Sequence, residues 1–578
     1  MERPSITDQQ VEVLQQRFAS VGIGRRTFLQ VAAGLAAMGE AGFNAKPVSA
    51  APKLAPSERL AQDQTLRYGG GGWYPDDPSS HDFNKDVYCG GVPALWAGLM
   101  KFTADFQPVP YVASKVSSNK DGSVWTFEIR EDSRWSDGTA CTASSFEWAW
   151  KRQLDPASAA PYASFLYDIK NAEKFNKKEL TDAREVGVRA KGDWTLEVTL
   201  EGPRGYFPVL AAYLAALPAH QSSVEKHKDK WTEAGNLVCN GPFTLESWEH
   251  GKQMVLKKNP HFFGAKDVTL ERVIIPIIPP IADALPYEAN EVNLTLLGSA
   301  ATTRRLQSGP NGKEVFRSPF PGTWYLLPQV TKAPFDNVKV RRAVSQAIDR
   351  EYVVKAALGA AIPAHSMIPP GFPGAVDDKK IRDIQRFDPK AAMAQLEGTP
   401  FEGGRNWPKI TLTLRNEGYG SKPLGEAVQS VLLEHLNMKT ELEALEQHVF
   451  RERLWKQELQ LVWIRWFMDY PDPHNEYFDP FYGKKTTGKR QAWVNDAFDK
   501  ELQAGRDTRD TKKRMEHYAK AEEIMQQDVG YVPVAWVVRY AAAKPIVKGF
   551  EKTKQGELMV DGNIYVDMLT KIYMVEKA

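Results

Sequence analysis

Cysteine is scarce in this sequence of 578 residues. The three cysteines, Cys89, Cys141 and Cys239, stand far apart, and none belongs to a CxxC or Cys/His pattern. Because the common zinc sites need such spacings, the cysteines predict no metal site. An odd number of cysteines cannot all pair within one chain, although one disulfide between two of them stays open.

Other absences exclude several functional classes. The net charge is only +2, whereas proteins that mainly bind nucleic acid or anionic membranes need a clear basic excess. The sequence has no GxSxG, HExxH, P-loop or dinucleotide-binding glycine pattern, so it predicts no catalytic residues, no cofactor and no enzyme. The ten histidines do not cluster, which argues against a metal site. A hydrophobic content of 42% with 16 tryptophans is enough for large buried cores.

The N-terminus has the features of an export signal. An arginine pair precedes an Ala/Gly-rich segment at 31–45 and a small-residue cleavage pattern at 48–50, and the residues of the motif are Arg25, Arg26, Phe28 and Leu29. This pattern predicts a twin-arginine signal peptide over residues 1–50, the alternative being an ordinary amphipathic helix. The apolar segment is too short to span a membrane. The residue directly after the cleavage site is Ala51 and not the cysteine that a lipoprotein needs there. We therefore expect a soluble periplasmic or extracellular protein that is not a lipoprotein.

Alternating and helical patterns indicate α/β layers. Trp125, Phe127 and Ile129 alternate as one face of a strand, and the following segment shows a helical apolar stripe behind a possible N-cap at Thr142. The run ERVIIPIIP at 271–279 predicts a fully buried strand. From residue 337 onward, helical and strand patterns alternate, which favours layers of helices on sheets.

One stretch, WIRWFMDYPDP at 463–473, could carry a binding site. A buried strand that stops on Trp466 would deliver Asp469 to an apolar rim, where a carboxylate needs a cationic partner such as a bound ammonium group. The alternative is an Asp/Pro turn after a core strand, with Asp472 and Pro473 shaping the loop. The oxygen-rich segment DYPDPHNEYFDP could also hold Ca²⁺, but it has prolines and lacks glycine-centred loop spacing.

Several longer segments carry a family resemblance. SVWTFEIREDSRWSDGTACTASSFEWAW, at 123–150, resembles the signature of the peptide and nickel class of extracellular solute-binding proteins, family 5. These are the extracytoplasmic receptors that feed ABC importers. Segments that look like the oligopeptide-binding branch follow in the same order: LDPASAAPYASFLYDI, WTLEVTLEGPRGYFPVL, DKWTEAGNLVCNGPFTLESW, PFDNVKVRRAVSQAIDRE and YVPVAWVVRY. The resemblance extends over about residues 64–578.

The resemblance implies a two-lobed α/β periplasmic binding protein fold (type II, cluster C-like), with an extra subdomain in the first lobe and strands that cross between the lobes. It places domain I at 64–96, 221–321 and 537–578, domain II at 97–220, and domain III at 322–536.

The resemblance also implies a function. The chain is expected to act as a monomer that captures a short peptide between its lobes and delivers it to an ABC transporter permease in the membrane. Asp469, three residues after Trp466, matches the family aspartate that pairs with the peptide α-ammonium, and Tyr162 matches a tyrosine that lines the cleft. Trp463, Phe467 and Trp324 are candidates for aromatic walls around side-chain pockets, with core packing as the alternative for each.

Two departures from the family pattern concern the other end of the ligand and a cysteine pair. Trp463 stands where some members have a basic residue for the peptide carboxylate. Arg465 lies nearby, but alternation along a strand would point Arg465 and Trp466 to opposite faces. A cysteine pair of some members falls at Gly322 and Phe467, so that bridge is absent.

Other functions stay open at this point. The same fold is known to bind oligosaccharides, and tryptophan stacks well on sugar rings; loss of affinity on Asp469→Ala would favour a peptide receptor over a sugar receptor. The hypothesis that the protein captures nickel or haem has less support, because the histidines do not cluster in the sequence. A secreted Ca²⁺-binding protein or an enzyme is the alternative from another class.

Overall fold

The computed structural model describes residues 43–44, 52, 54–69, 77–86, 93–278, 284–415, 421–484, 490, 492–560 and 566–576. The export motif with Arg25, Arg26, Phe28 and Leu29 lies outside these residues, as does Cys89. Cys141 and Cys239 are buried free thiols. Among the helices of the described residues, none has both the length and the hydropathy needed to cross a membrane.

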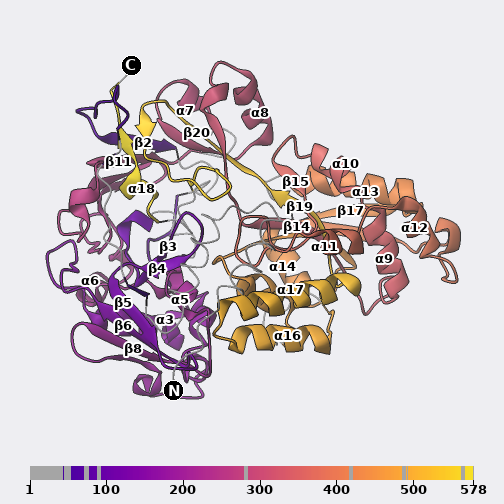
Figure 1. Cartoon of the computed structure of the whole chain (residues 1–578), viewed down its shortest axis with the longest axis horizontal. Coiled ribbons are helices and arrows are strands. Elements are labelled where there is room, and N and C mark those ends of the chain that lie inside the picture. The colour runs from indigo at the N-terminus through magenta and orange to yellow at the C-terminus, as the bar shows by residue number, and fades with distance from the viewer. Residues whose placement is uncertain are drawn as a thin grey trace, which may run out of the picture.

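The first of two lobes contains two large sheets (Figure 1) and two strand pairs, β3 (Met100–Phe102) with β4 (Pro108–Pro110) and β21 (Val547–Lys548) with β22 (Tyr573–Met574). The larger sheet has the strand order β13 (Val315–Ser318), β20 (Arg539–Ala543), β12 (Leu294–Leu297), β2 (Thr65–Gly69), β11 (Arg272–Pro276), β10 (Gln253–Lys258) and β9 (Phe243–Glu249). The smaller sheet has the order β1 (Phe43–Asn44), β5 (Ala113–Ser118), β6 (Val124–Ile129), β8 (Thr195–Thr199) and β7 (Val188–Ala190). The helices of this lobe include α3 (Ala143–Leu154), α4 (Ala172–Asn176), α5 (Phe207–Leu210), α6 (Gln221–His227), α7 (Leu285–Glu288), α8 (Ala300–Ser308) and α18 (Met568–Lys571).

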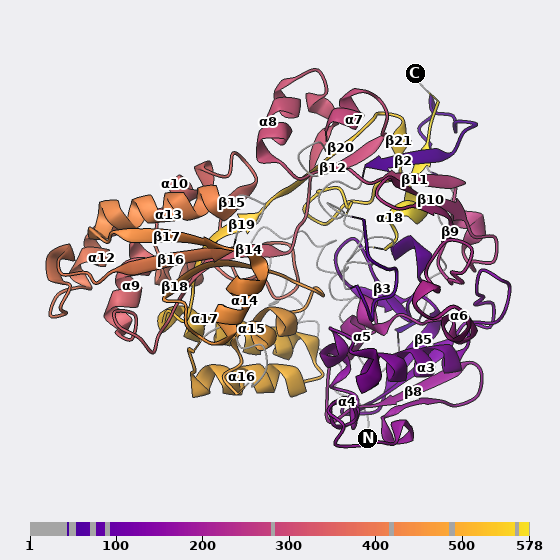
Figure 2. The ribbon, with the colours of Figure 1, turned by 180° about the vertical axis from the view of Figure 1, so that it is seen from behind.

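The second lobe is built on one mixed sheet. Its strand order is β15 (Ala361–Pro363), β19 (Val532–Val537), β14 (Gly322–Pro328), β18 (Leu461–Phe467), β16 (Ile410–Arg415) and β17 (Thr440–Leu445). Its helices include α9 (Val338–Ala347), α10 (Arg350–Lys355), α11 (Lys379–Ile384), α12 (Pro389–Ala394), α13 (Ser421–Leu436), α14 (Gln447–Trp455), α15 (Asp479–Phe481), α16 (Asp496–Asp507) and α17 (Thr511–Gln527). Figure 2 shows α12 and α13 away from the pair α16–α17, with strands of the sheet between them.

Two short connections join the lobes. The chain passes from β13 in the first lobe to β14 in the second between residues 318 and 322, and it returns from β19 to β20 between residues 537 and 539. This arrangement confirms the expected two-lobed α/β fold with crossing strands.

Local patterns in the sequence predicted several elements correctly. In β6, Trp125, Phe127 and Ile129 face the core and alternate with partly exposed residues. Helix α3 begins directly after Thr142, whose backbone N–H donates to Ser145 Oγ at 3.3 Å. Such an N-terminal bond satisfies a backbone donor that has no partner inside the helix.

The expectation of a fully buried strand at 271–279 is wrong. Strand β11 ends at Pro276, and its residues alternate between buried and partly exposed. Only Val273 and Ile275 are fully buried. The strand lies between β2 and β10 with one face on the core, so the apolar residues of its other face are only partly covered.

Candidate functional site

Strand β18 places its alternate side chains in two different environments. Trp463 stacks on Trp324 of the neighbouring strand β14, with ring centroids 5.3 Å apart and planes 5° from parallel. Both rings are buried in the cluster that α9 and α13 form on one face of the sheet. The two tryptophans are therefore core residues in this structure, and their contact with a ligand stays a prediction.

The same face carries Arg465 and Phe467. The Arg465 guanidinium lies 3.7 Å from the centroid of the Phe467 ring and 5.5 Å from that of Trp324. Phe467 also packs against Phe320 at 4.6 Å. Trp466 belongs to the other core cluster, so the expected separation of Arg465 and Trp466 onto opposite faces is confirmed.

Asp469 lies just beyond the end of β18, in a loop organised by Asn475. The buried Asn475 side chain accepts hydrogen bonds from Trp466 Nε1 at 3.2 Å and from the Asp469 backbone N–H at 2.8 Å. Its Nδ2 group donates to Asp469 Oδ2 at 3.2 Å and to Asp479 Oδ2 at 3.0 Å. One amide therefore fixes Trp466 and Asp469 relative to each other.

The surroundings of the Asp469 carboxyl change its pKa. Burial raises the pKa of Asp469 to about 6, and nearby Asp479 adds to this effect, while the bonds from Asn475 and Tyr213 and the charge of Arg490 oppose it. Asp469 forms no ion pair with another described residue; the Arg490 guanidinium lies over the Trp466 ring, 4.1 Å from its centroid. A carboxylate that is held in place and lacks a close counterion is suited to bind a cationic group.

Glu476, in the same loop, is buried more deeply. Both of its carboxyl oxygens lack a hydrogen-bond partner among the described residues. Burial, together with the charges of Asp469 and Glu522, raises the pKa of Glu476 well above its ordinary value. Burial therefore favours the neutral form of the Glu476 carboxyl.

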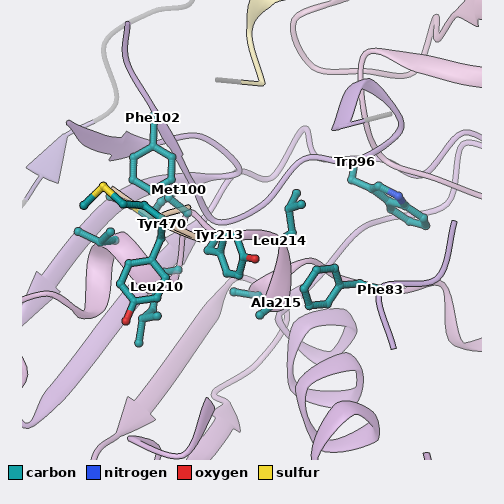
Figure 3. Close-up of a cluster of buried hydrophobic side chains, with 14 of the residues drawn as sticks. Phe83, Trp96, Met100, Phe102, Leu210, Tyr213, Leu214, Ala215 and Tyr470 are labelled. Carbon is teal, nitrogen blue, oxygen red and sulfur yellow. The ribbon is translucent and has the colours of Figure 1, made fainter. Parts of the chain in front are cut away.

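The first lobe reaches Asp469 through Tyr213, whose hydroxyl donates to Asp469 Oδ1 at 3.4 Å. The next residue after Asp469, Tyr470, packs against Tyr213 and Phe165 with centroid distances of 5.8 Å to each ring. Figure 3 shows Tyr470 of the second lobe among Met100, Leu210 and Tyr213 of the first. The Asp469 loop thus lies at the interface between the lobes.

Tyr162 belongs to the same aromatic cluster. Its ring is partly exposed and lies 4.8 Å from Phe165 and 5.8 Å from Phe83. Phe165 in turn packs on Tyr213 at 5.2 Å. The structure therefore brings Tyr162, Trp466 and Asp469 toward one interface, while Trp324, Trp463 and Phe467 lie on the other face of the sheet.

Asp472 does more than shape the loop. Its carboxylate accepts two hydrogen bonds from Arg514 of α17, at 2.7 and 3.1 Å, and both side chains are almost completely buried. It also accepts a bond from the His474 backbone N–H at 2.9 Å. This ion pair fixes the loop to α17.

Two further expectations concern the missing cysteine pair and a Ca²⁺ site. Gly322 and Phe467, the positions assigned to the missing cysteine pair, lie directly opposite each other on β14 and β18. Within the described part of the chain, no group of three or more His, Cys, Asp or Glu side chains is placed to hold a metal ion.

The chain is similar in sequence to known proteins. Residues 107–489 match the bacterial extracellular solute-binding proteins, family 5 middle. The chain is 32% identical over 483 residues to the periplasmic oligopeptide-binding protein OppA of Salmonella typhimurium, covering 82% of this chain and 87% of that protein.

Solved structures are similar over most of the chain. A periplasmic murein tripeptide-binding protein, MppA, in its unliganded open form has a TM-score of 0.75 at 25% identity, covering 90% of this chain and 99% of the other. OppA of Haemophilus influenzae in complex with the peptide RPPGFSPFR has a TM-score of 0.71 at 25% identity, covering 90% of this chain and all of the other.

Proposed function

Because the chain belongs to the bacterial extracellular solute-binding proteins of family 5, we propose that it captures short peptides between its two lobes and delivers them to an ABC transporter permease. The observation that carries this proposal is Asp469, a carboxylate at the lobe interface that is fixed by Asn475 and has no close counterion among the described residues. In this proposal the peptide α-ammonium supplies the missing charge. Similar proteins are named for oligopeptides, and one is solved with a peptide bound.

An ion pair between Asp469 and the peptide ammonium would couple ligand binding to lobe closure. An ionised carboxylate buried alone is strongly disfavoured, whereas a buried pair with an ammonium group is compensated. Asp469 contacts Tyr213 of the opposite lobe, so closure around an empty site would desolvate the carboxylate without an ion-pair partner among the described residues. Only an ammonium-bearing ligand removes that penalty, and this gives the two states different affinities for the ligand.

The proposal also covers the oligomeric state, the export route and the domain boundaries. The protein acts as a monomer without enzymatic activity, and it is exported by the twin-arginine route, with residues 1–50 cleaved off as the signal peptide. The three domains are 64–96 with 221–321 and 537–578, then 97–220, and then 322–536. Conversion of Arg25 and Arg26 to lysine should keep the protein in the cytoplasm, whereas export of that variant would show a different route.

Isothermal titration of ligand-stripped protein tests the function. We expect saturable binding of short peptides with unrelated sequences, because main-chain contacts and roomy pockets tolerate different side chains. A panel of neutral oligosaccharides should give no heat. Binding of the sugars with no response to peptides would overturn the proposal in favour of the oligosaccharide receptor.

A further inference from the structure

A second contact between the lobes lies at the turn that joins α16 to α17, where Figure 1 shows these helices beside the first lobe. Arg204 Nη1 of the first lobe donates to Asp507 Oδ1 at 2.9 Å. Arg509 Nη1 of the turn donates to the carbonyl oxygen of Lys120, in the turn between β5 and β6, at 3.2 Å. These bonds involve none of the residues assigned to the ligand.

Gly205 makes the closest approach in this contact. A Cβ atom at position 205 would lie 2.6 Å from the Thr508 carbonyl oxygen and 2.9 Å from both Cα and the carbonyl oxygen of Arg509. All three atoms are backbone of the opposite lobe, so a rotating side chain cannot relieve the clash. Gly205 does not have a positive φ. Its small size, rather than its backbone freedom, therefore permits the contact.

Arg204 is held in position by its own lobe. Its Nε donates to Asp168 Oδ1 at 2.5 Å, and only 8% of its side chain is exposed. The Tyr206 hydroxyl also donates to Asp168. Tyr206 is in turn joined to His474 of the second lobe by a 3.1 Å hydrogen bond and by ring stacking at 4.2 Å. Arg204 thus needs little further ordering when it meets Asp507.

In the second lobe, one residue links this turn to the loop that carries Asp469. Arg514 binds Asp472 of the loop, and its Nε donates to the Gly505 carbonyl oxygen near the end of α16, at 3.2 Å. The loop and the turn are therefore parts of one rigid unit. Movement of that unit toward the first lobe would bring Asp469 to Tyr213 and the turn to Gly205 together.

We propose that residues 204–205 of the first lobe and residues 507–509 of the second form a latch that stabilises the closed arrangement of the lobes without touching the ligand. This inference rests on the proposed function, in which ligand is held between closed lobes. Since apparent affinity depends on the population of the binding-competent state, the latch sets the affinity for all ligands by one common factor. Ligand preference is left to the Asp469 site.

Gly205→Ala tests the latch, and Gly202→Ala is its matched control. Gly202 lies three residues earlier in the same segment, and a Cβ there would meet only the end of the Arg204 side chain, at 3.4 Å. We expect Gly205→Ala to weaken binding of two unrelated peptides by the same factor, about ten-fold or more, because overpacking against fixed backbone is costly. Asp507→Asn should weaken both by about two- to five-fold, since Asp507 is half exposed. Gly202→Ala should bind like the unaltered protein.

A measurement on ligand-free protein tests the latch independently of the proposed peptide binding. In small-angle X-ray scattering of ligand-free samples, Gly205→Ala should be more extended than Gly202→Ala, while both unfold at the same urea concentration. If the unaltered protein binds no peptide, the proposed function fails and the scattering difference alone decides on the latch. If peptides bind and Gly205→Ala matches Gly202→Ala in affinity, or its losses differ between peptides, the latch is overturned.

Discussion

Replacing Asp469 by asparagine should change stability and peptide affinity in opposite directions. Burial raises the pKa of this carboxyl from an ordinary value of 3.8 to about 6. A group with a raised pKa contributes stability that is fully present below pH 3.8 and is lost as pH rises through 6. At pH 7 the ligand-free protein with its lobes closed therefore bears the whole cost of an ionised, buried Asp469, and the neutral amide of asparagine removes it.

The size of the effect follows from the shift. One pKa unit corresponds to about 1.4 kcal/mol, so a shift of about two units amounts to about 3 kcal/mol, which partial exposure of the carboxyl reduces to about 2 kcal/mol. The free energy of unfolding of ligand-free Asp469→Asn should rise by about this amount. Peptide binding should weaken by about 2–5 kcal/mol, or at least about 30-fold, because the buried ammonium loses its charge partner.

Urea unfolding at pH 7 and titration calorimetry measure the two quantities. An N-acetylated peptide is the matched ligand, because it lacks the ammonium group but keeps the rest of the chain. It should bind weakly to the unaltered protein and no more weakly to Asp469→Asn, because asparagine leaves no unpaired charge at the site. Asp469→Asn that binds the free and acetylated peptides as the unaltered protein does would refute the assignment of Asp469 as the ammonium anchor.

Three further results are expected. Peptide affinity of the unaltered protein should fall as pH drops below about 6, approaching ten-fold per pH unit, because protons compete with the ammonium for Asp469; calorimetry between about pH 5 and 8 should find this dependence and find it missing in Asp469→Asn. Arg514→Leu should lower the free energy of unfolding by about 3–5 kcal/mol, because it leaves Asp472 buried without its partner; Lys177→Met, which breaks an exposed pair, is the control in urea unfolding and should change less than about 1 kcal/mol. Trp463→Phe should cost about 1–3 kcal/mol of stability through lost packing on Trp324 while leaving peptide affinity unchanged, and an affinity loss larger than a few-fold would return Trp463 to the ligand site.

The sequence alone predicted those strands and helices that depend on residues close to one another in the chain. Alternation of Trp125, Phe127 and Ile129 predicted β6, and the cap at Thr142 predicted the start of α3, because these patterns depend on neighbours within a few residues. Strand β11 was misjudged because an unbroken apolar run does not reveal whether both faces of a strand are covered.

The candidate site was only partly predictable. Asp469 and Trp466 could be singled out from their own segment, and the resemblance gave them a role. Tyr213 is 256 positions from Asp469, and no pattern in the sequence connects the two. Asn475 lies six residues after Asp469, and only the structure shows its side chain joining Trp466, Asp469 and Asp479.

Mass spectrometry of the small molecules that purify with the protein tests the central claim most directly. The protein should be isolated without denaturant, exchanged into volatile buffer and then mildly unfolded to release whatever occupies the lobe interface. The account predicts a mixture of short peptides of unrelated sequence with free N-terminal ammonium groups. A single series of glycans, or peptides with blocked N-termini, would contradict it.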